Sequence, residues 1–253
     1  MICDLQKASL LKRASAFLLD IILLAVLVTG LAFLISTATG YDNYTQQMND
    51  LEKEYEAKFD VSLDLTEQKH AELSDEEKAR VNEAYTAYAA DERVVYAYNM
   101  MINLILLTTS LSILAAYLVL EFILPLIFGN GQTVGKKVFG IGLMQTNGVR
   151  VSTFSMFVRT VLGKCTIGTL VPAAIIILSM LGSAGIAGPI VLLLILVLQI
   201  GLIVGTKTNS AIHDVLAYTV TVDLASQMIF DSPEQMLEYK KKIHAEAADR
   251  AQY

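Results

Sequence analysis

Four long apolar windows constrain this chain more than any other feature of its sequence. They cover residues 14–35, 100–128, 165–181 and 188–205. A helix needs roughly 20 apolar residues to cross the hydrocarbon core of a bilayer, so each window is close to the length of a membrane span. The chain of 253 residues is 54% hydrophobic and only 17% charged, whereas soluble domains carry about 25% charged residues. We therefore expect an all-α membrane protein with four transmembrane helices in the lipid bilayer.

The windows divide the chain into six segments with different expected roles. They are a cytoplasmic N-terminus with the first transmembrane helix (1–40), an extracytoplasmic helical hairpin inserted into the chain (41–98), the second transmembrane helix (99–128), a small cytoplasmic β-ribbon with an amphipathic helix (129–164), a transmembrane hairpin of the third and fourth helices (165–205), and a cytoplasmic His-Asp segment with a tail helix (206–253).

Basic residues predict the orientation of the chain. Residues 129–164 contain no Asp or Glu but five cations, which are Lys136, Lys137, Arg150, Arg159 and Lys164. Short loops rich in Lys and Arg stay on the cytoplasmic side of a membrane. This bias predicts that both termini are cytoplasmic and that the acidic insert is outside.

Residues 41–98 read as two helices because apolar side chains recur in them at steps of three and four residues. Ser74 and Glu77 form a capping box, which predicts a helix that starts near Asp75 and runs on into the second span. We expect the tyrosine-bearing faces of the two helices to pack together; these faces contain Met48, Leu51, Tyr55, Phe59, Val81, Tyr85, Tyr88 and Val95. The insert is either a solvated stalk or a docking surface for a protein partner.

The basic segment has the pattern of a small β-ribbon. Asn147-Gly148 is a strong hairpin signal between residues 138–144 and 149–151. The β-branched run 215–222 is expected to pair with this ribbon. Residues 153–162 have an apolar face with Arg159 off it, which favours an amphipathic helix at the membrane interface. Ser232-Pro233 predicts the start of the tail helix.

Two carboxylates fall inside the apolar windows and are therefore functional candidates. They are Asp20 in the first window and Glu121 in the second. Arg13 lies on the same helix face as Asp20, about 10 Å away along the helix axis. The predicted topology puts Asp20 and Glu121 at similar depth, so we expect a carboxylate pair near Arg13.

His213-Asp214 follows the fourth window, and its two residues have competing interpretations. His213 could act as a proton relay or a metal ligand. Asp214 is instead expected to be the salt-bridge partner of Lys136, Lys137 or Arg159, in preference to a catalytic group.

The glycine-rich run 131–137 imitates a phosphate-binding loop but lacks two of its defining residues, because Asn130 and Lys137 stand where Gly and Ser or Thr are needed. We read this run as a tight turn whose two lysines, Lys136 and Lys137, meet anionic lipid headgroups or internal carboxylates. The sequence contains no catalytic triad order, paired zinc-ligand motif or cofactor fingerprint, so we expect neither an enzyme nor a bound metal or cofactor. The sequence shows no basic face with interleaved aromatic residues, so we do not expect it to bind nucleic acid.

Several short motifs resemble the RDD family of bacterial membrane proteins, which is named for one arginine and two aspartates. The matching pieces are Lys12-Arg13-Ala14 followed by Asp20, then Gly131-Gln-Thr-Val-Gly-Lys-Lys137, Gly140-Ile141, Arg159 and His213-Asp214-Val-Leu-Ala-Tyr-Thr219. By this resemblance, Arg13, Asp20 and Asp214 are the arginine and the two aspartates for which the family is named. It also implies a bacterial cytoplasmic membrane and suggests transport, with cation/proton antiport proposed for some members.

The chain departs from the family pattern at three places. Val134 stands where the family usually has proline, residues 208–210 replace an often basic stretch, and the insert is long.

Two functional hypotheses follow. In the first, the chain is a small-ion or solute transporter of the cation/proton exchange type, in which Asp20, with Glu121, alternates between protonated and ion-bound states while Arg13 tunes its affinity. Four short spans enclose little volume, so such a transporter would work as a homo-oligomer. In the second, it is a non-catalytic scaffold that binds an envelope or secreted partner through the insert, and the charged residues only fix the fold.

Overall fold

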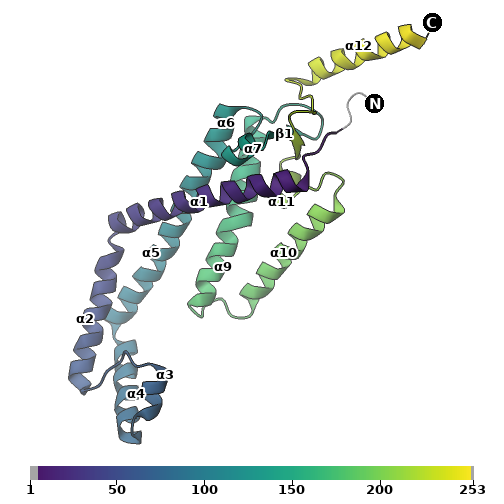
Figure 1. Ribbon diagram of the computed structural model, residues 1–253. Coiled ribbons are helices and arrows are strands. Elements are labelled where there is room, and N and C mark those ends of the chain that lie inside the picture. Colours follow the sequence, from purple (N-terminus) through teal and green to yellow (C-terminus); the bar gives the residue numbers. More distant parts are fainter. Residues whose placement is uncertain (1–4, 252–253) are drawn as a thin grey trace. The chain divides into compact units, whose positions relative to one another are not determined.

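The computed structural model describes residues 5–251, apart from the side chains of Glu67 and residues 248–251. The chain forms two compact units (Figure 1). The first comprises Met1–Leu31 and Ser112–Tyr253, and the second is Ala32–Leu111. Two long helices belong to both, α1 (Leu10–Thr39) and α5 (Glu92–Tyr117). Each unit is described here by itself.

Four helices of the described chain are long and apolar enough to cross a membrane, as the sequence predicted. They are Leu10–Thr39, Glu92–Phe128, Thr153–Met180 and Ala187–Gly205. The first and last are α1 and α10 (Ala187–Gly205). The second joins α5 to the π-helix η1 (Leu118–Ile123) and α6 (Leu124–Phe128), and the third joins α8 (Thr153–Phe157), the π-helix η2 (Val158–Leu170) and α9 (Val171–Met180).

The third of these helices differs from the prediction. Residues 153–162 were expected to form a separate interfacial helix, but they continue without a break into the apolar window. Arg159 is only 2% exposed, because it lies in η2 and faces the interior of the first unit. A cation that looked like the polar edge of an amphipathic helix is therefore part of the core.

A two-stranded antiparallel sheet lies next to these helices. β1 (Ile141–Gln145) pairs with β2 (Thr219–Asp223) in a register that places Leu143 opposite Thr221. The Asn147-Gly148 turn forms, but the strand after it contributes a single bridge, Met144 to Arg150. The predicted pairing of residues 138–144 with 149–151 is therefore wrong in its main part. β1 pairs instead with β2, whose β-branched residues are buried.

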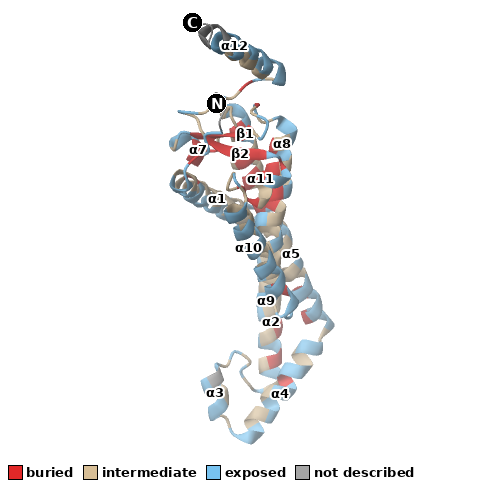
Figure 2. Cartoon of the chain, turned by 90° about the vertical axis from the view of Figure 1, so that its right-hand side faces the viewer, coloured by how far each residue is buried: buried red, intermediate tan, exposed pale blue. Residues whose placement is uncertain are grey.

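Short helices connect the sheet to the spans. α7 (Val134–Val138) precedes β1, and α11 (Ile212–Leu216) precedes β2. The predicted strand 215–222 therefore begins later, at Thr219, and His213 and Asp214 lie on a helix. Buried residues gather around β1, β2, α7 and α11 (Figure 2). The tail helix α12 (Pro233–Ala251) begins as predicted, where the Ser232 hydroxyl accepts the N–H of Gln235.

The second unit contains α2 (Tyr41–Phe59), the short α3 (Glu67–Glu72) and α4 (Asp75–Ala90). The Ser74–Glu77 capping box at the start of α4 is confirmed. The helix does not run on into the second span as predicted. It ends at Ala90, and Asp91 begins α5 by accepting the N–H of Arg93.

Aromatic packing between α2 and α4 agrees in part with the predicted faces. Tyr55 and Tyr88 meet edge to face with ring centroids 5.7 Å apart, and the Tyr55 hydroxyl donates to Asp91. Tyr85 was placed on the same face but is 62% exposed. The contact surface is narrower than the sequence pattern predicted, with Leu51 and Ala84 buried in it.

Candidate functional site

Asp214 is the centre of a buried charge network in the first unit. Its Oδ1 accepts hydrogen bonds from Nη2 and Nε of Arg159 at 2.7 and 3.2 Å. Its Oδ2 accepts the N–H of Ala211 and lies 3.5 Å from Nη2 of Arg13. Burial alone would raise the pKa of Asp214, but the positive charge of Arg159 together with the hydrogen bonds from Arg159 and the Ala211 N–H outweighs burial and holds the pKa below its ordinary value. Asp214 is thus a carboxylate shared by two arginines.

A glycine in η2 allows this network to form. A Cβ at Gly163 would lie 2.5 Å from the Cβ of His213, which is closer than real side chains approach. Only glycine lets α11 pack this tightly on η2, and this packing delivers Asp214 to Arg159, whose Nε also donates to the Thr219 hydroxyl. π-helical segments are rare and often occur at functional sites.

Asp20 has a different role from the predicted one. Its carboxylate accepts hydrogen bonds from the Thr133 hydroxyl and, at 2.7 Å, from the Gly135 N–H, at the start of α7. A Cβ at Gly135 would also clash with the carbonyl oxygen of Ala16. The expected carboxylate pair of Asp20 and Glu121 near Arg13 is not formed, because Asp20 holds α7 against α1 and Arg13 turns to Asp214.

The two lysines of α7 point into different surroundings, and α7 replaces the predicted glycine turn. Lys136 is buried, with its Nζ 3.3 Å from the Thr133 hydroxyl. Burial, together with the nearby charge of Lys164, lowers the pKa of Lys136 to about 7. Lys137 instead lies over the ring of Phe128, with its Nζ 4.0 Å from the ring centroid.

Glu121 forms a buried ion pair with Lys164 at 2.6 Å between η1 and η2. The Thr160 hydroxyl donates to the backbone carbonyl of Glu121, and the Tyr117 and Thr169 hydroxyls lie 2.7 Å apart on the same two helices. Sequence reasoning missed Lys164 as a site residue. A signal was available in the sequence. Lys164 stands at the edge of the third apolar window, and Glu121, a carboxylate without a predicted partner, lies in the second.

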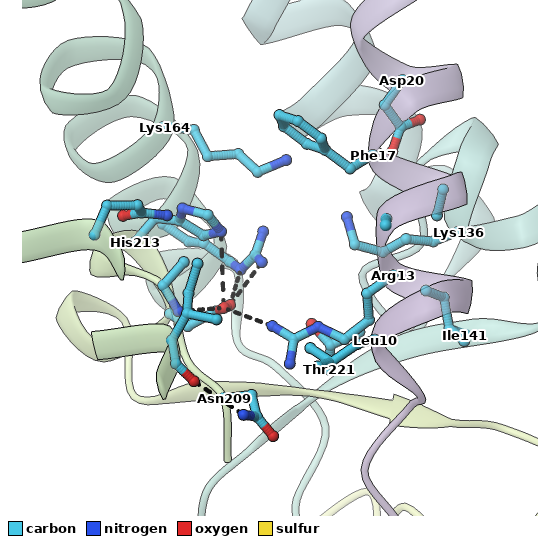
Figure 3. A pocket seen from close by; sticks show the side chains of 17 residues that line it. Leu10, Arg13, Phe17, Asp20, Lys136, Ile141, Lys164, Asn209, His213 and Thr221 are labelled. Carbon is cyan, nitrogen blue, oxygen red and sulfur yellow. Dashed lines mark hydrogen bonds and ion pairs between the residues drawn. The ribbon is translucent and has the colours of Figure 1, made fainter. Parts of the chain in front are cut away.

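Two adjoining cavities meet at these charged groups. One of about 260 Å³ is lined by Arg13, Lys136, Arg159 and Asp214 among others. The nitrogen ends of Arg13, Lys136 and Lys164 turn toward a common space in it (Figure 3). A second of about 370 Å³ continues between the candidate spans past Glu121. Both cavities are lined by Phe17, Asp20, Lys164, Gln199 and His213.

His213 lies at the boundary of the two cavities, with its Nε2 3.8 Å from Oδ2 of Asp214. Burial lowers its pKa well below the ordinary value, although the negative charge of Asp214 opposes this shift. The imidazole is therefore neutral at pH 7. Within residues 5–251 no group of three His, Cys, Asp or Glu side chains is arranged to hold a metal ion.

The sequence profile of the RDD family matches residues 7–218, which include Arg13, Asp20 and Asp214. This chain belongs to the RDD family. The resemblance inferred from short motifs is thereby confirmed, and with it the assignment to a family of membrane proteins. No curated protein and no solved structure matches the chain. In this RDD chain Arg13 and Asp214 lie in one network, whereas Asp20 fastens α7 to α1.

Proposed function

We propose that this RDD-family chain transports a small charged solute across the membrane through the two adjoining cavities. The observation that carries the proposal is that charged groups line both cavities. Arg13, Lys164 and Glu121 lie inside candidate spans, and Lys136 lies on α7. Ionisable side chains within membrane helices are costly, and they mark substrate and ion pathways. Cavities lined by such groups between helices give a solute a place to bind.

The proposed orientation places the sheet, α7 and α11 on the cytoplasmic side. Support comes from the five cations and the absence of acids in residues 129–164. Residues 41–98 then lie outside, both termini lie in the cytoplasm, and the membrane is the bacterial cytoplasmic membrane that the family implies.

Glu121 replaces Asp20 as the preferred coupling group for cation/proton exchange. Asp20 is occupied by two hydrogen bonds from α7, so a change in its protonation would disturb the fold. Glu121 has one mobile partner, Lys164, and both side chains line the cavity between the spans. The pair can separate and reform as a proton or ion arrives.

The test is flux into liposomes that contain the purified chain and a pH-sensitive dye. We expect an imposed sodium or potassium gradient to drive proton movement. Glu121→Gln should abolish it, while Glu238→Gln on the exposed face of α12 leaves it intact. Circular dichroism and gel filtration establish that each variant is folded. Absence of flux in the wild-type chain under every gradient would overturn the transport proposal.

A second candidate function is an accessory or scaffold role. It is favoured by the insert, which forms a compact unit with its own buried residues, Leu51, Tyr55 and Ala84. An envelope or secreted protein is then the partner, and the charged network of the first unit is structural. This role predicts that a crosslinkable group at exposed Tyr85 captures one specific protein in cells, and that flux is absent.

A further inference from the structure

Arg159 has an unmet hydrogen-bonding group. Among the residues that the structure describes, its Nη1 is the buried side-chain atom without a hydrogen-bond partner. The other two nitrogens of the same guanidinium contact Asp214 and Thr219. A buried donor without an acceptor is unfavourable and calls for an unseen water or ion. Arg159 also lines the smaller cavity, which is the space beside it that can hold an acceptor.

The charge of the cavity decides between a water and an ion. Four cationic side chains line it against two carboxylates; these are Arg13, Lys136, Arg159 and Lys164, and Asp20 and Asp214. One positive charge remains in excess even when Glu121, the partner of Lys164, is counted with them. Lys136 forms no ion pair with a carboxylate anywhere in residues 5–251. A water molecule would satisfy Nη1 but would leave this excess charge in place.

We infer that the cavity binds a phosphate group, held by Arg159 Nη1, Lys136 and Arg13. Guanidinium and ammonium groups from three separate elements, η2, α7 and α1, suit an acceptor with several oxygens and more than one negative charge. The cavity volume of about 260 Å³ accommodates such a group. This inference goes beyond the proposed function: cation/proton exchange is assigned to Glu121 and Lys164 in the larger cavity, whereas the phosphate occupies the smaller one.

The phosphate can come from a free solute or from a lipid headgroup, since the second cavity opens between the spans and is lined by apolar residues such as Leu192 and Ile195. Both sources present the same chemistry to Lys136. They differ in whether the membrane itself supplies the ligand.

Lys136→Met is the decisive variant because it removes the cation without a carboxylate partner and leaves the Arg159–Asp214 pair intact. In phosphate-free buffer this variant should have a higher unfolding temperature than the wild type, since an unpaired buried charge disappears. A purely structural role for Lys136 predicts the opposite. Lys137→Met is the matched control, because Lys137 lies over Phe128 outside the cavity.

The experiment uses the full chain in micelles of a detergent with a sugar headgroup, which contain no phosphate, with inorganic phosphate titrated by calorimetry and unfolding followed by tyrosine fluorescence. We expect phosphate to bind and raise the unfolding temperature, with affinity about tenfold or more weaker in Lys136→Met and unchanged in Lys137→Met. A second arm adds phosphatidic acid to the micelles. A rise in unfolding temperature there, without an effect of free phosphate, assigns the group to a lipid headgroup, provided that Lys136→Met removes the rise.

Two results would overturn the inference: no effect of either phosphate source, or equal effects in the wild type and Lys136→Met. The outcome is separable from that of the transport experiment. Phosphate binding without flux retains the phosphate site and removes the transport role, whereas flux without phosphate binding retains transport and removes the phosphate site.

Discussion

The two compact units contain ion pairs of almost the same length in opposite surroundings. Arg159 and Asp214 lie 2.7 Å apart with side chains 2% and 1% exposed. Arg93 and Glu54 in the second unit lie 3.0 Å apart with side chains 52% and 54% exposed. Exposed pairs are screened by water and add little stability, whereas breaking a buried pair leaves an uncompensated charge in the interior. Distance alone therefore does not rank these contacts; burial does.

The largest expected effect comes from Asp214→Asn. This change leaves Arg159 buried without its counter-charge, and breaking a buried pair in this way costs roughly 3–5 kcal/mol of unfolding free energy. The measurement is chemical denaturation in detergent micelles. Asp231→Asn is the control, because Asp231 pairs with Arg150 at the surface, with its side chain 73% exposed. Equal effects of the two substitutions would remove the contrast between buried and exposed pairs.

Leu51→Ala tests whether the second unit has a core of its own. Leu51 is 5% exposed, and replacing a buried leucine with alanine typically costs about 2–5 kcal/mol. Hydrogen exchange should accelerate in α2 and α4 and remain unchanged around Asp214. Tyr85→Ala, at an exposed position of the same unit, should leave hydrogen exchange unchanged both in α2 and α4 and around Asp214. Faster exchange around Asp214 in Leu51→Ala would mean that the two units unfold together.

A smaller effect is expected from pH, with different windows for the two units. Lys136 has a pKa lowered to about 7, so between pH 7 and about 10.4 the unfolded chain holds a proton that the folded chain lacks. Stability of the first unit therefore rises with pH across that window. The lowered pKa of His213 acts in the same direction, because below about pH 6.5 the unfolded chain binds a proton that the folded one excludes.

The acids of the second unit titrate elsewhere. Hydrogen bonds from Arg93 lower the pKa of Glu54 and of Asp91, so their contribution is present near neutrality and is lost only as the pH falls below about 4. Unfolding temperatures at pH 5.5, 7 and 9 should rise in that order for the first unit. A flat profile over this range would contradict the buried, uncompensated state of Lys136.

The smallest effect is expected from Glu54→Gln. The change removes only the exposed ion pair with Arg93, and solvent replaces it at little cost. The unfolding temperature should stay within experimental error of the wild type, in a scan that resolves the Leu51→Ala loss. A drop as large as that of Leu51→Ala would make the exposed pair a structural element and reverse the ranking by burial.

The sequence predicted the features of this fold that depend on composition and on neighbouring residues. The four spans follow from apolar length, and the caps at Ser74 and Ser232 follow from residues three or four positions apart. Arg159 was one of three predicted partners for Asp214, together with Lys136 and Lys137. The structure pairs Asp214 with Arg159 because η2 turns Arg159 inward.

Features that depend on distant contacts were not predictable in the same way. The run 215–222 was predicted to pair with the ribbon, and Thr219–Asp223 does pair with β1, but nothing local showed that it would do so in place of the nearer strand beyond Asn147-Gly148. Asp20 looked like half of a carboxylate pair, but its partner is the backbone of α7, which a motif cannot reveal. The π-helical segments have no sequence pattern of their own, so the meeting of Glu121 and Lys164 was missed.

The close approaches at Gly135 and Gly163 fix two seams of the first unit, α7 against α1 and α11 against η2, in part by main-chain atoms. A contact built from side chains can be widened or narrowed by substitution, whereas these two seams have no spare width. A side chain at either glycine would have to displace a whole helix, so the spacing around Asp20 and Asp214 is a property of the backbone.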